Sequence, residues 1–288
     1  MDKQIILNGE FHSASSNYLN TNRAFRYGDG LFESIKIING NPISLEYHFQ
    51  RITAGLEALM IKQDQTFNLK KINSLINSLI THNKIENGGK IRLSVFRNGQ
   101  GTYQPENNDL SYLIEAVTSK NNYYELNESG ISVDVFKDIY KPINYISKFK
   151  TLNALIYVLA AEFAKKKMLD DSLIINATGK IIEATASNIF IVSNGVLYTP
   201  PLEDGCIGGI MRMTVINIAL SNNITVYENS LMPQNLLNAD EVFLTNTISG
   251  ITWVRGFQQK RYYNDTAKKI IGLINEQVVN YERDLKGN

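Results

Sequence analysis

A lysine at position 150 is the first residue whose surroundings indicate covalent chemistry. Residues 147–153 read Ser-Lys-Phe-Lys-Thr-Leu-Asn, and the apolar residues from there on have the spacing of one face of an α-helix: Leu152, Leu155, Ile156, Leu159 and Phe163. The pattern predicts Lys150 at the N-terminus of this helix, where the helix dipole disfavours a protonated ammonium. An unprotonated lysine can attack an aldehyde, so Schiff-base chemistry is expected at Lys150 if other residues support it.

Three further features could belong to a ligand site. Gly208-Gly209 precedes a predicted helix that starts at Ile210, and the free N–H groups of a helix start can bind phosphate. Glu183 ends a predicted strand in a segment with few charges, and Arg51 lies on a predicted helix. Each feature alone has a simpler explanation: a turn, a solvated strand end and a surface ion pair. Only their combination favours a ligand site.

The elements that must position these residues predict a mixed α/β protein. A polar, asparagine-rich stretch at residues 118–129 predicts an interdomain linker, which separates a smaller domain at 1–120 from a larger one at 121–288. On the helix that carries Arg51, we expect His48 and Arg51 to share a face other than the buried one. Apolar spacing predicts these elements: strands at 35–38, 91–95, 111–117 and 241–247, hairpins at 172–183 and 188–199, and helices at 47–60, 72–80, 210–220 and 270–278.

Composition excludes several classes of protein. The 288 residues are 43% hydrophobic and carry a net charge of +1, which gives no reason to expect nucleic acid or an anionic membrane as a partner. One cysteine rules out a disulfide framework, and three scattered histidines show no metal-ligand spacing. No apolar run has the length of a membrane span, and the start of the chain lacks a signal-peptide pattern. We therefore expect a soluble, cytoplasmic protein without a metal site.

Six motifs in their order along the chain resemble the class IV aminotransferases, which use pyridoxal 5′-phosphate (PLP). This family includes branched-chain and D-amino acid aminotransferases and aminodeoxychorismate lyases. The resemblance extends from residue 22 to residue 251. The motifs are Tyr-Gly-Asp-Gly-Leu-Phe-Glu at 27–33, His-Phe-Gln-Arg at 48–51, Lys-Thr-Leu-Asn at 150–153, Glu-Ala-Thr-Ala-Ser-Asn-Ile-Phe at 183–190, Thr-Pro-Pro at 199–201 and Gly-Cys-Ile-Gly-Gly-Ile-Met-Arg at 205–212.

The resemblance implies a role for each candidate residue. Lys150 would hold the cofactor as a Schiff base and move the substrate proton, and Lys148 would be only a neighbour. Glu183 would face the pyridine nitrogen and keep it protonated, so that the ring can draw in electrons. The cofactor phosphate would be bound by Arg51, by the helix start at Gly209, Ile210 and Met211, and by the Thr247 hydroxyl. Many relatives have a threonine in place of Met211, so that contact would involve only the backbone.

The resemblance also implies a fold and an assembly. It implies a fold type IV enzyme, with a smaller N-terminal α/β domain, a larger C-terminal domain with a β-barrel-like core, and the cofactor in the cleft between them. It further implies a homodimer.

The substrate is less closely defined by the sequence. Tyr27, Phe32, Arg97 and Tyr103 are the candidate substrate-binding residues. Residues 97–105 lack the arginine–histidine pair with which the D-amino acid enzymes bind the substrate carboxylate, which argues against D-specificity. Branched-chain enzymes usually have a tyrosine where this chain has Leu155.

Three functions remain open. The first is amino transfer between an L-amino acid, possibly branched-chain, and a 2-oxo acid. The alternative is an aminodeoxychorismate lyase that releases 4-aminobenzoate and pyruvate. A cofactor-binding protein without chemistry is disfavoured, because binding alone requires neither Lys150 nor Glu183.

Overall fold

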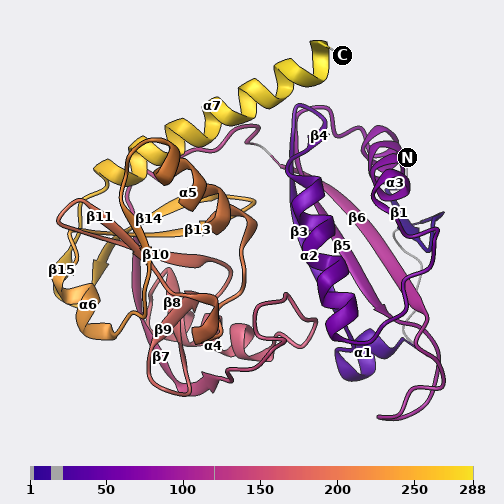
Figure 1. The fold of residues 1–288 in the computed structure, drawn as a ribbon, viewed down its shortest axis with the longest axis horizontal. Helices are drawn as coiled ribbons and strands as arrows, with labels where there is room; N and C mark the ends of the chain where they lie inside the picture. Colours follow the sequence, from indigo (N-terminus) through magenta and orange to yellow (C-terminus); the bar gives the residue numbers. More distant parts are fainter. Residues whose placement is uncertain (1–2, 14–21, 120, 288) are drawn as a thin grey trace. The chain divides into compact units, whose positions relative to one another are not determined.

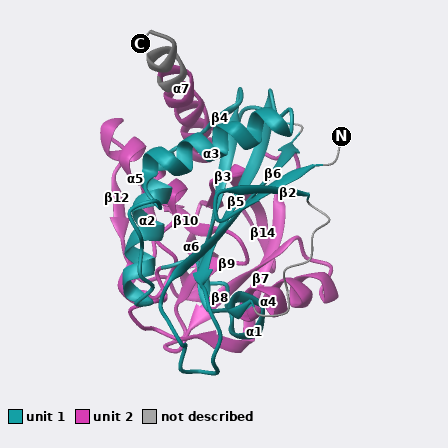
Figure 2. Ribbon diagram, turned by 90° about the vertical axis from the view of Figure 1, so that its right-hand side faces the viewer, with its two compact units in different colours: residues 1–123, 149–154 teal, residues 124–148, 155–288 magenta. Residues whose placement is uncertain are grey.

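Two compact units divide the chain in the computed structural model, which describes residues 3–13, 22–119 and 121–287, with side chains up to residue 280. Unit 1 comprises residues 1–123 and 149–154, and unit 2 comprises residues 124–148 and 155–288 (Figure 2). The domain boundary expected from the sequence falls after residue 120, which lies outside the described residues. The structure also assigns the short segment around Lys150 to unit 1.

Unit 1 is built on a six-stranded antiparallel sheet with the strand order β2-β1-β6-β5-β3-β4. Helices α2 and α3 pack against this sheet, and α1 is a short helix before β3 (Figure 1). The elements are β1 (Gln4–Leu7), β2 (Glu10–Ser13), α1 (Arg23–Tyr27), β3 (Gly30–Ile38), β4 (Asn41–Pro42), α2 (Leu45–Ala58), α3 (Leu69–His82), β5 (Gly88–Arg97) and β6 (Leu110–Ser119).

The two long helices of unit 1, α2 and α3, differ in how well their buried face could be predicted. In α3 every predicted apolar position is buried, and the Asn68 side chain caps the helix by accepting from the Lys71 N–H at 2.9 Å. In α2 the expectation that His48 lies off the buried face is wrong, because His48 is 1% exposed. The buried row of α2 consists of Leu45, His48, Ile52, Gly55 and Leu56.

His48 faces inward because a buried carboxylate lies beneath it. Glu33 of β3 is 2% exposed, and its Oε2 lies 2.7 Å from His48 Nδ1. Arg51 donates from Nε to Glu33 Oε1 at 2.7 Å and from Nη2 to Oε2 at 2.5 Å. Burial by itself raises the pKa of Glu33, but the charge of Arg51 and the hydrogen bonds from both partners lower it to about 2. This cluster ties α2 to β3.

Unit 2 contains the barrel that the sequence analysis expects. Strands β10, β13, β14, β7, β8 and β9 pair in this order, and a pairing of β9 with β10 closes the ring. Strands β11, β12 and β15 extend the sheet outside it. The strands are β7 (Ile131–Lys141), β8 (Asp171–Asn176), β9 (Ile181–Ala184), β10 (Asn188–Ser193), β11 (Val196–Thr199), β12 (Val226–Glu228), β13 (Glu241–Asn246), β14 (Gly250–Phe257) and β15 (Lys260–Arg261).

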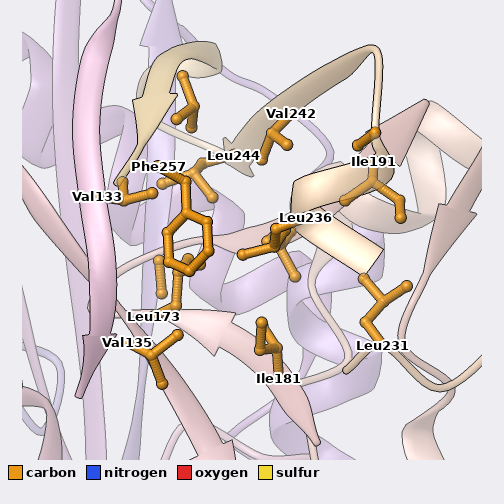
Figure 3. Close-up of a cluster of buried hydrophobic side chains, with 14 of the residues drawn as sticks. Val133, Val135, Leu173, Ile181, Ile191, Leu231, Leu236, Val242, Leu244 and Phe257 are labelled. Atoms are coloured by element: carbon orange, nitrogen blue, oxygen red, sulfur yellow. The ribbon is translucent and has the colours of Figure 1, made fainter. Parts of the chain in front are cut away.

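The barrel interior is filled by side chains from alternate strand positions. Val133, Leu173, Leu244 and Phe257 point into one buried cluster (Figure 3). Leu236 of helix α6 joins this cluster as well. Among the described residues no helix is both long and apolar enough to cross a bilayer. The other helices of unit 2 are α4 (Leu155–Lys166), the 3₁₀ helix η1 (Leu202–Asp204), α5 (Ile210–Ser221), α6 (Pro233–Asn238) and α7 (Asp265–Gly287).

The lowered pKa of Glu33 predicts how the free energy of unfolding changes at acidic pH. Because the folded pKa of about 2 lies below the ordinary value of 4.5, Glu33 contributes stability above pH ~4.5 that is lost as the pH falls towards 2. That contribution is on the order of 3 kcal/mol. Urea unfolding of the wild type should therefore show a falling free energy between pH 5 and pH 3. In Glu33→Gln this pH dependence should be much smaller and the stability at pH 6 lower.

The matched control is Glu46→Gln, which changes an exposed carboxylate in the first turn of α2, the helix that carries His48 and Arg51. This variant should keep the pH dependence of the wild type. A Glu33→Gln protein that loses as much stability as the wild type between pH 5 and pH 3 would show that other groups cause the acid sensitivity.

Candidate active site

Lys150 does not lie at a helix start, so that prediction is wrong. Helix α4 begins at Leu155, and Lys150 lies between a turn at residues 145–148 and an isolated β-bridge of Thr151 with Leu31 of β3. The Lys150 carbonyl accepts from the Phe32 N–H at 2.9 Å, and the Leu152 N–H donates to the Gly30 carbonyl at 2.9 Å. The helix dipole therefore does not explain the chemistry of this lysine. Its place is set by strand pairing instead.

The apolar spacing after Lys150 was also misassigned in part. Leu155 is 64% exposed and Leu159 is 38% exposed, whereas the alanines Ala160 and Ala164 are the buried residues of α4. Small residues are buried here because α4 packs closely on β7 and β8. The two leucines therefore form part of an exposed apolar surface on α4.

Neighbouring side chains in unit 1 hold the Lys150 segment in place. Phe149 is 8% exposed and lies beside Gly55 of α2, where an added Cβ would come 3.4 Å from the Phe149 ring. Gly30 allows the close approach of the chain, since a Cβ there would lie 2.3 Å from the Val95 carbonyl oxygen. The Lys150 ammonium lies 4.5 Å from the centre of the Phe32 ring. Phe32, a predicted substrate-binding residue, thus contacts the predicted Schiff-base lysine.

Glu183 is a buried carboxylate with three hydrogen-bond donors. The simpler explanation, a solvent-exposed strand end, is excluded because Glu183 is only 2% exposed. Lys141 Nζ donates to Oε1 at 2.6 Å, the Tyr157 hydroxyl donates to Oε1 at 2.7 Å, and the Ile207 N–H donates to Oε2 at 2.7 Å. All these groups belong to unit 2. The ion pair with Lys141 makes the charged form of this buried acid tolerable.

Glu183 belongs to a row of polar side chains across three barrel strands. Glu183 of β9 pairs with Asn188 of β10, which pairs with Thr245 of β13. Directly paired residues place their side chains on the same face of a sheet. We call these three residues the Glu183 row. Within it the Thr245 hydroxyl is buried and has no hydrogen-bond partner among the described residues.

The Glu183 row also fixes the start of helix α5. Asn188 Nδ2 donates to the Ile207 carbonyl at 2.7 Å, while Glu183 accepts from the N–H of the same residue. Gly209 is the N-cap of α5, and a Cβ there would lie 1.9 Å from Asn188 Oδ1. Only glycine fits at this position, and the predicted helix start is confirmed. The N–H groups of Ile210 and Met211 are not used by the helix itself.

The turn after β13 carries the last predicted phosphate ligand, Thr247. Its carbonyl accepts from the Tyr124 hydroxyl at 3.1 Å, and Asn246 Oδ1 accepts from the Ile248 and Ser249 N–H groups at 2.9 and 2.8 Å. The turn is therefore held in one conformation. Whether the Thr247 hydroxyl binds phosphate remains a prediction.

Arg97 has structural partners in unit 1. Its Nε donates to Asp29 Oδ2 at 3.0 Å, and its Nη2 donates to the Leu59 carbonyl at 2.7 Å. Its Nη1 donates to Asn108 Oδ1 and to the Met60 carbonyl. Arg97 therefore connects the end of β5 to the end of α2 and to the loop that follows β5, and its role as a substrate contact stays a prediction.

A second buried arginine, Arg23, holds the same loop. It donates to Asp29 Oδ2 at 2.8 Å and to the carbonyls of Gly101 and Thr102 at 3.1 and 2.8 Å. Its guanidinium also lies 4.8 Å from the centre of the Tyr27 ring. Tyr27 lies 5.8 Å from Tyr103, which is 91% exposed, as measured between ring centres. Tyr27 and Tyr103, two of the three aromatic residues predicted to contact substrate, thus lie at this loop.

Three side chains that pair with predicted site residues were not expected from the sequence. Glu33 is the partner of Arg51, and Lys141 and Tyr157 are partners of Glu183. Glu33 could have been found, since it ends the motif at 27–33. Nothing in the local sequence distinguishes Lys141 from a lysine that ends an exposed strand.

The residues present fit PLP, the cofactor that the resemblance implies. Each carboxylate oxygen has two lone pairs, and Glu183 Oε2 has one donor among the described residues, so it could accept from a ring nitrogen. The unpartnered Thr245 hydroxyl and the first turn of α5 supply donors near the same row, as a phosphate group requires. Arg51 supplies a cation in unit 1, although Glu33 shares its charge.

Comparison with known proteins supports the same family. Residues 30–257 match the model of the class IV amino-transferases. D-alanine aminotransferase from Staphylococcus aureus (strain N315) is 28% identical over 254 residues, which is 87% of each chain. A putative branched-chain-amino-acid aminotransferase from Methanocaldococcus jannaschii is 29% identical over 262 residues, 86% of this chain and 85% of the relative.

A solved structure has the same fold over nearly the whole chain. The branched-chain aminotransferase of Thermoproteus uzoniensis, crystallised with norvaline, matches with a TM-score of 0.85 and 25% identity, covering 95% of this chain and 93% of that chain. The family model spans well over half of the present sequence. The chain therefore belongs to the class IV aminotransferases, an enzyme family that depends on PLP.

Proposed function

We propose that this enzyme transfers an amino group between an L-amino acid and a 2-oxo acid, with PLP bound covalently to Lys150. The observation that carries the proposal is the Glu183 row in unit 2. There a buried carboxylate paired with Lys141, a hydroxyl without a hydrogen-bond partner among the described residues, and a helix start lie together. When bound, PLP supplies an electron-withdrawing ring and a carbonyl group that accepts the amino group.

Each candidate site residue has a defined role in this proposal. Lys150 holds the cofactor through its ε-amino group, and the same amino group moves the proton at the substrate Cα. Glu183 keeps the ring nitrogen protonated through its negative charge. Arg51, the Thr247 hydroxyl and the N–H groups of Ile210 and Met211 bind the phosphate, for which a helix start and a guanidinium are suited.

The loop at residues 97–105 supports the L-configuration of the substrate. It contains one arginine, Arg97, and no histidine. Because Asp29, Asn108 and two carbonyls engage Arg97, this loop offers a substrate carboxylate a different environment from an arginine–histidine pair. Tyr27, Phe32 and Tyr103 are then the proposed substrate contacts. The lyase is kept as a second candidate because Lys-Thr-Leu-Asn at 150–153 also occurs in the lyases of this family.

The proposal includes a homodimer, as the family resemblance implies. The exposed apolar side chains of α4, Leu155 at 64% and Val158 at 56%, provide a surface that a second copy could cover.

The covalent role of Lys150 can be tested by reduction. Borohydride treatment of the PLP-loaded protein should attach the cofactor irreversibly to the peptide that contains Lys150, as read by mass spectrometry of a digest. Lys148 is the matched control, because it is a lysine two residues earlier in the same segment. Lys148→Met should keep the label and Lys150→Met should lose it. A label that stays after Lys150→Met would refute the assignment.

An experiment on Arg51 must distinguish its proposed contact with the cofactor phosphate from its ion pair with Glu33. Arg51→Met should raise the Kd for PLP about ten- to a hundredfold, since a charge-assisted hydrogen bond is worth roughly 1.5–3 kcal/mol. The Kd for pyridoxal, which has no phosphate, should change much less. Equilibrium titration of the apo-protein measures both constants.

The double variant Arg51→Met/Glu33→Gln is the control for the lost ion pair, because it leaves no charged Glu33 without a partner. If the double variant binds PLP as tightly as the wild type, Arg51 acts only through Glu33 and the phosphate contact is excluded.

The transferase and the lyase differ in their need for an acceptor. With L-glutamate or L-leucine and no oxo acid, the transferase should convert the cofactor to its amine form, which absorbance detects. D-alanine should give no conversion, because of the composition of the 97–105 loop. A lyase would release pyruvate from aminodeoxychorismate without any acceptor. Pyruvate release, without conversion of the cofactor to its amine form by any amino acid, would show that the enzyme is a lyase. Conversion of the cofactor by D-alanine alone would show that the amino-acid substrate has the D-configuration.

A further inference from the structure

Lys141 is a buried lysine that has no role in the proposed reaction as described above. It is the last residue of β7 and is 7% exposed. Its ammonium donates to Glu183 Oε1 at 2.6 Å and to the Ser147 carbonyl at 3.0 Å. A buried ammonium is tolerated only when it is paired, and the carboxylate of Glu183 supplies that pairing. The two charges therefore depend on each other.

Tyr157 is the second side chain that holds Glu183. Its hydroxyl lies on α4 and donates to Glu183 Oε1 at 2.7 Å. Burial first, and then the negative charge of Glu183, raise the pKa of Tyr157 far above its usual value. The phenol therefore keeps its proton at all working pH values and always acts as a donor. Glu183 Oε1 then accepts from two donors, one charged and one neutral.

These donors leave a single acceptor position on Glu183. Both lone pairs of Oε1 are used by Lys141 and Tyr157, and one lone pair of Oε2 is used by the Ile207 N–H. The remaining lone pair of Oε2 has no donor among the described residues. Because the carboxylate is tied to β7, α4 and the segment before α5, it cannot turn to offer another oxygen.

We propose that Lys141 and Tyr157 are positioning residues that keep Glu183 in its charged form and direct its one open acceptor position, on Oε2, to the ring nitrogen of the cofactor. This inference rests on the proposed role of Glu183. Among the described residues, Cys206 is a further titratable group that interacts with Glu183. Burial, followed by the charge of Glu183, raises the pKa of the Cys206 thiol to about 12. The thiol is thus neutral at pH 7, and Lys141 is the cation that stabilises Glu183.

The loss of Lys141 has a definite chemical consequence. A buried carboxylate without a cationic partner tends to take up a proton, because the charged form is poorly solvated in the interior. The one proton shared by Glu183 and the ring nitrogen would then lie on the carboxyl group, and the ring nitrogen would be unprotonated. The protonation state of the ring then reports whether Lys141 acts through Glu183.

The test reconstitutes the apo-protein with PLP that carries ¹⁵N in its ring, and measures the ¹⁵N chemical shift at pH 7. This shift differs strongly between a protonated and an unprotonated pyridine nitrogen. The wild type should show the protonated ring. Lys141→Met should move the signal most of the way to the unprotonated position, Tyr157→Phe should move it partly, and Lys141→Arg should restore the wild-type value.

Two controls separate this inference from the proposed function. Glu183→Gln should give the unprotonated ring, and an unchanged signal in this variant would refute the role of Glu183 itself and with it the present inference. Lys180→Met removes a different lysine of unit 2, which pairs with buried Asp204 at 2.7 Å, and it should leave the ring signal unchanged.

If Glu183→Gln alters the ring signal but Lys141→Met and Tyr157→Phe leave it as in the wild type, Lys141 and Tyr157 have only a structural role. Should Lys141→Met fail to fold, Tyr157→Phe, which loses only one hydroxyl, decides the question.

Discussion

A carboxylate buried away from water must be paired, and this constraint organises the chemistry-bearing parts of both units. In unit 2 the constraint acts at Glu183, whose three donors come from β7, α4 and the segment before α5. These hydrogen bonds connect β9 to β7 within the barrel, and to α4 and the segment before α5 outside it. The position of helix α5, and with it the N–H groups at its start, thus depends on the same carboxylate that is proposed to face the cofactor ring.

The same constraint acts twice in unit 1. Glu33 draws His48 and Arg51 onto the buried face of α2, and Asp29 draws Arg23 and Arg97 together. In each case one acid fixes two cationic or potentially cationic side chains. Arg23 then binds three successive carbonyls of the loop after β5, so the acid also determines the conformation of that loop. Ion pairing and loop geometry are therefore coupled in unit 1.

The placement of Lys150 shows how backbone pairing can replace a local explanation. The helix-start argument assigned its reactivity to a dipole, but the segment pairs with the first residues of β3. Two backbone hydrogen bonds to β3 fix the chain at Lys150 and Leu152, and the Phe32 ring lies beside the Lys150 ammonium. The two glycines of the motif at 27–33 have a physical reason as well. Gly28 adopts a left-handed conformation with φ of 64°, and Gly30 lies against the neighbouring strand.

The sequence by itself determined the family, the α/β class and most elements whose signal is local. The buried face of α3, the hairpins at 172–183 and 188–199 and the glycine start of α5 follow from apolar spacing and turn chemistry, which depend only on nearby residues. Only the tertiary structure decided which residues pair over long separations. Lys141 finds Glu183 42 residues away, and the β9–β10 pairing closes the barrel. A buried charge is stable only beside an opposite charge. Because the fold brings that opposite charge from a distant part of the chain, the residues near each charge in the sequence do not identify its partner.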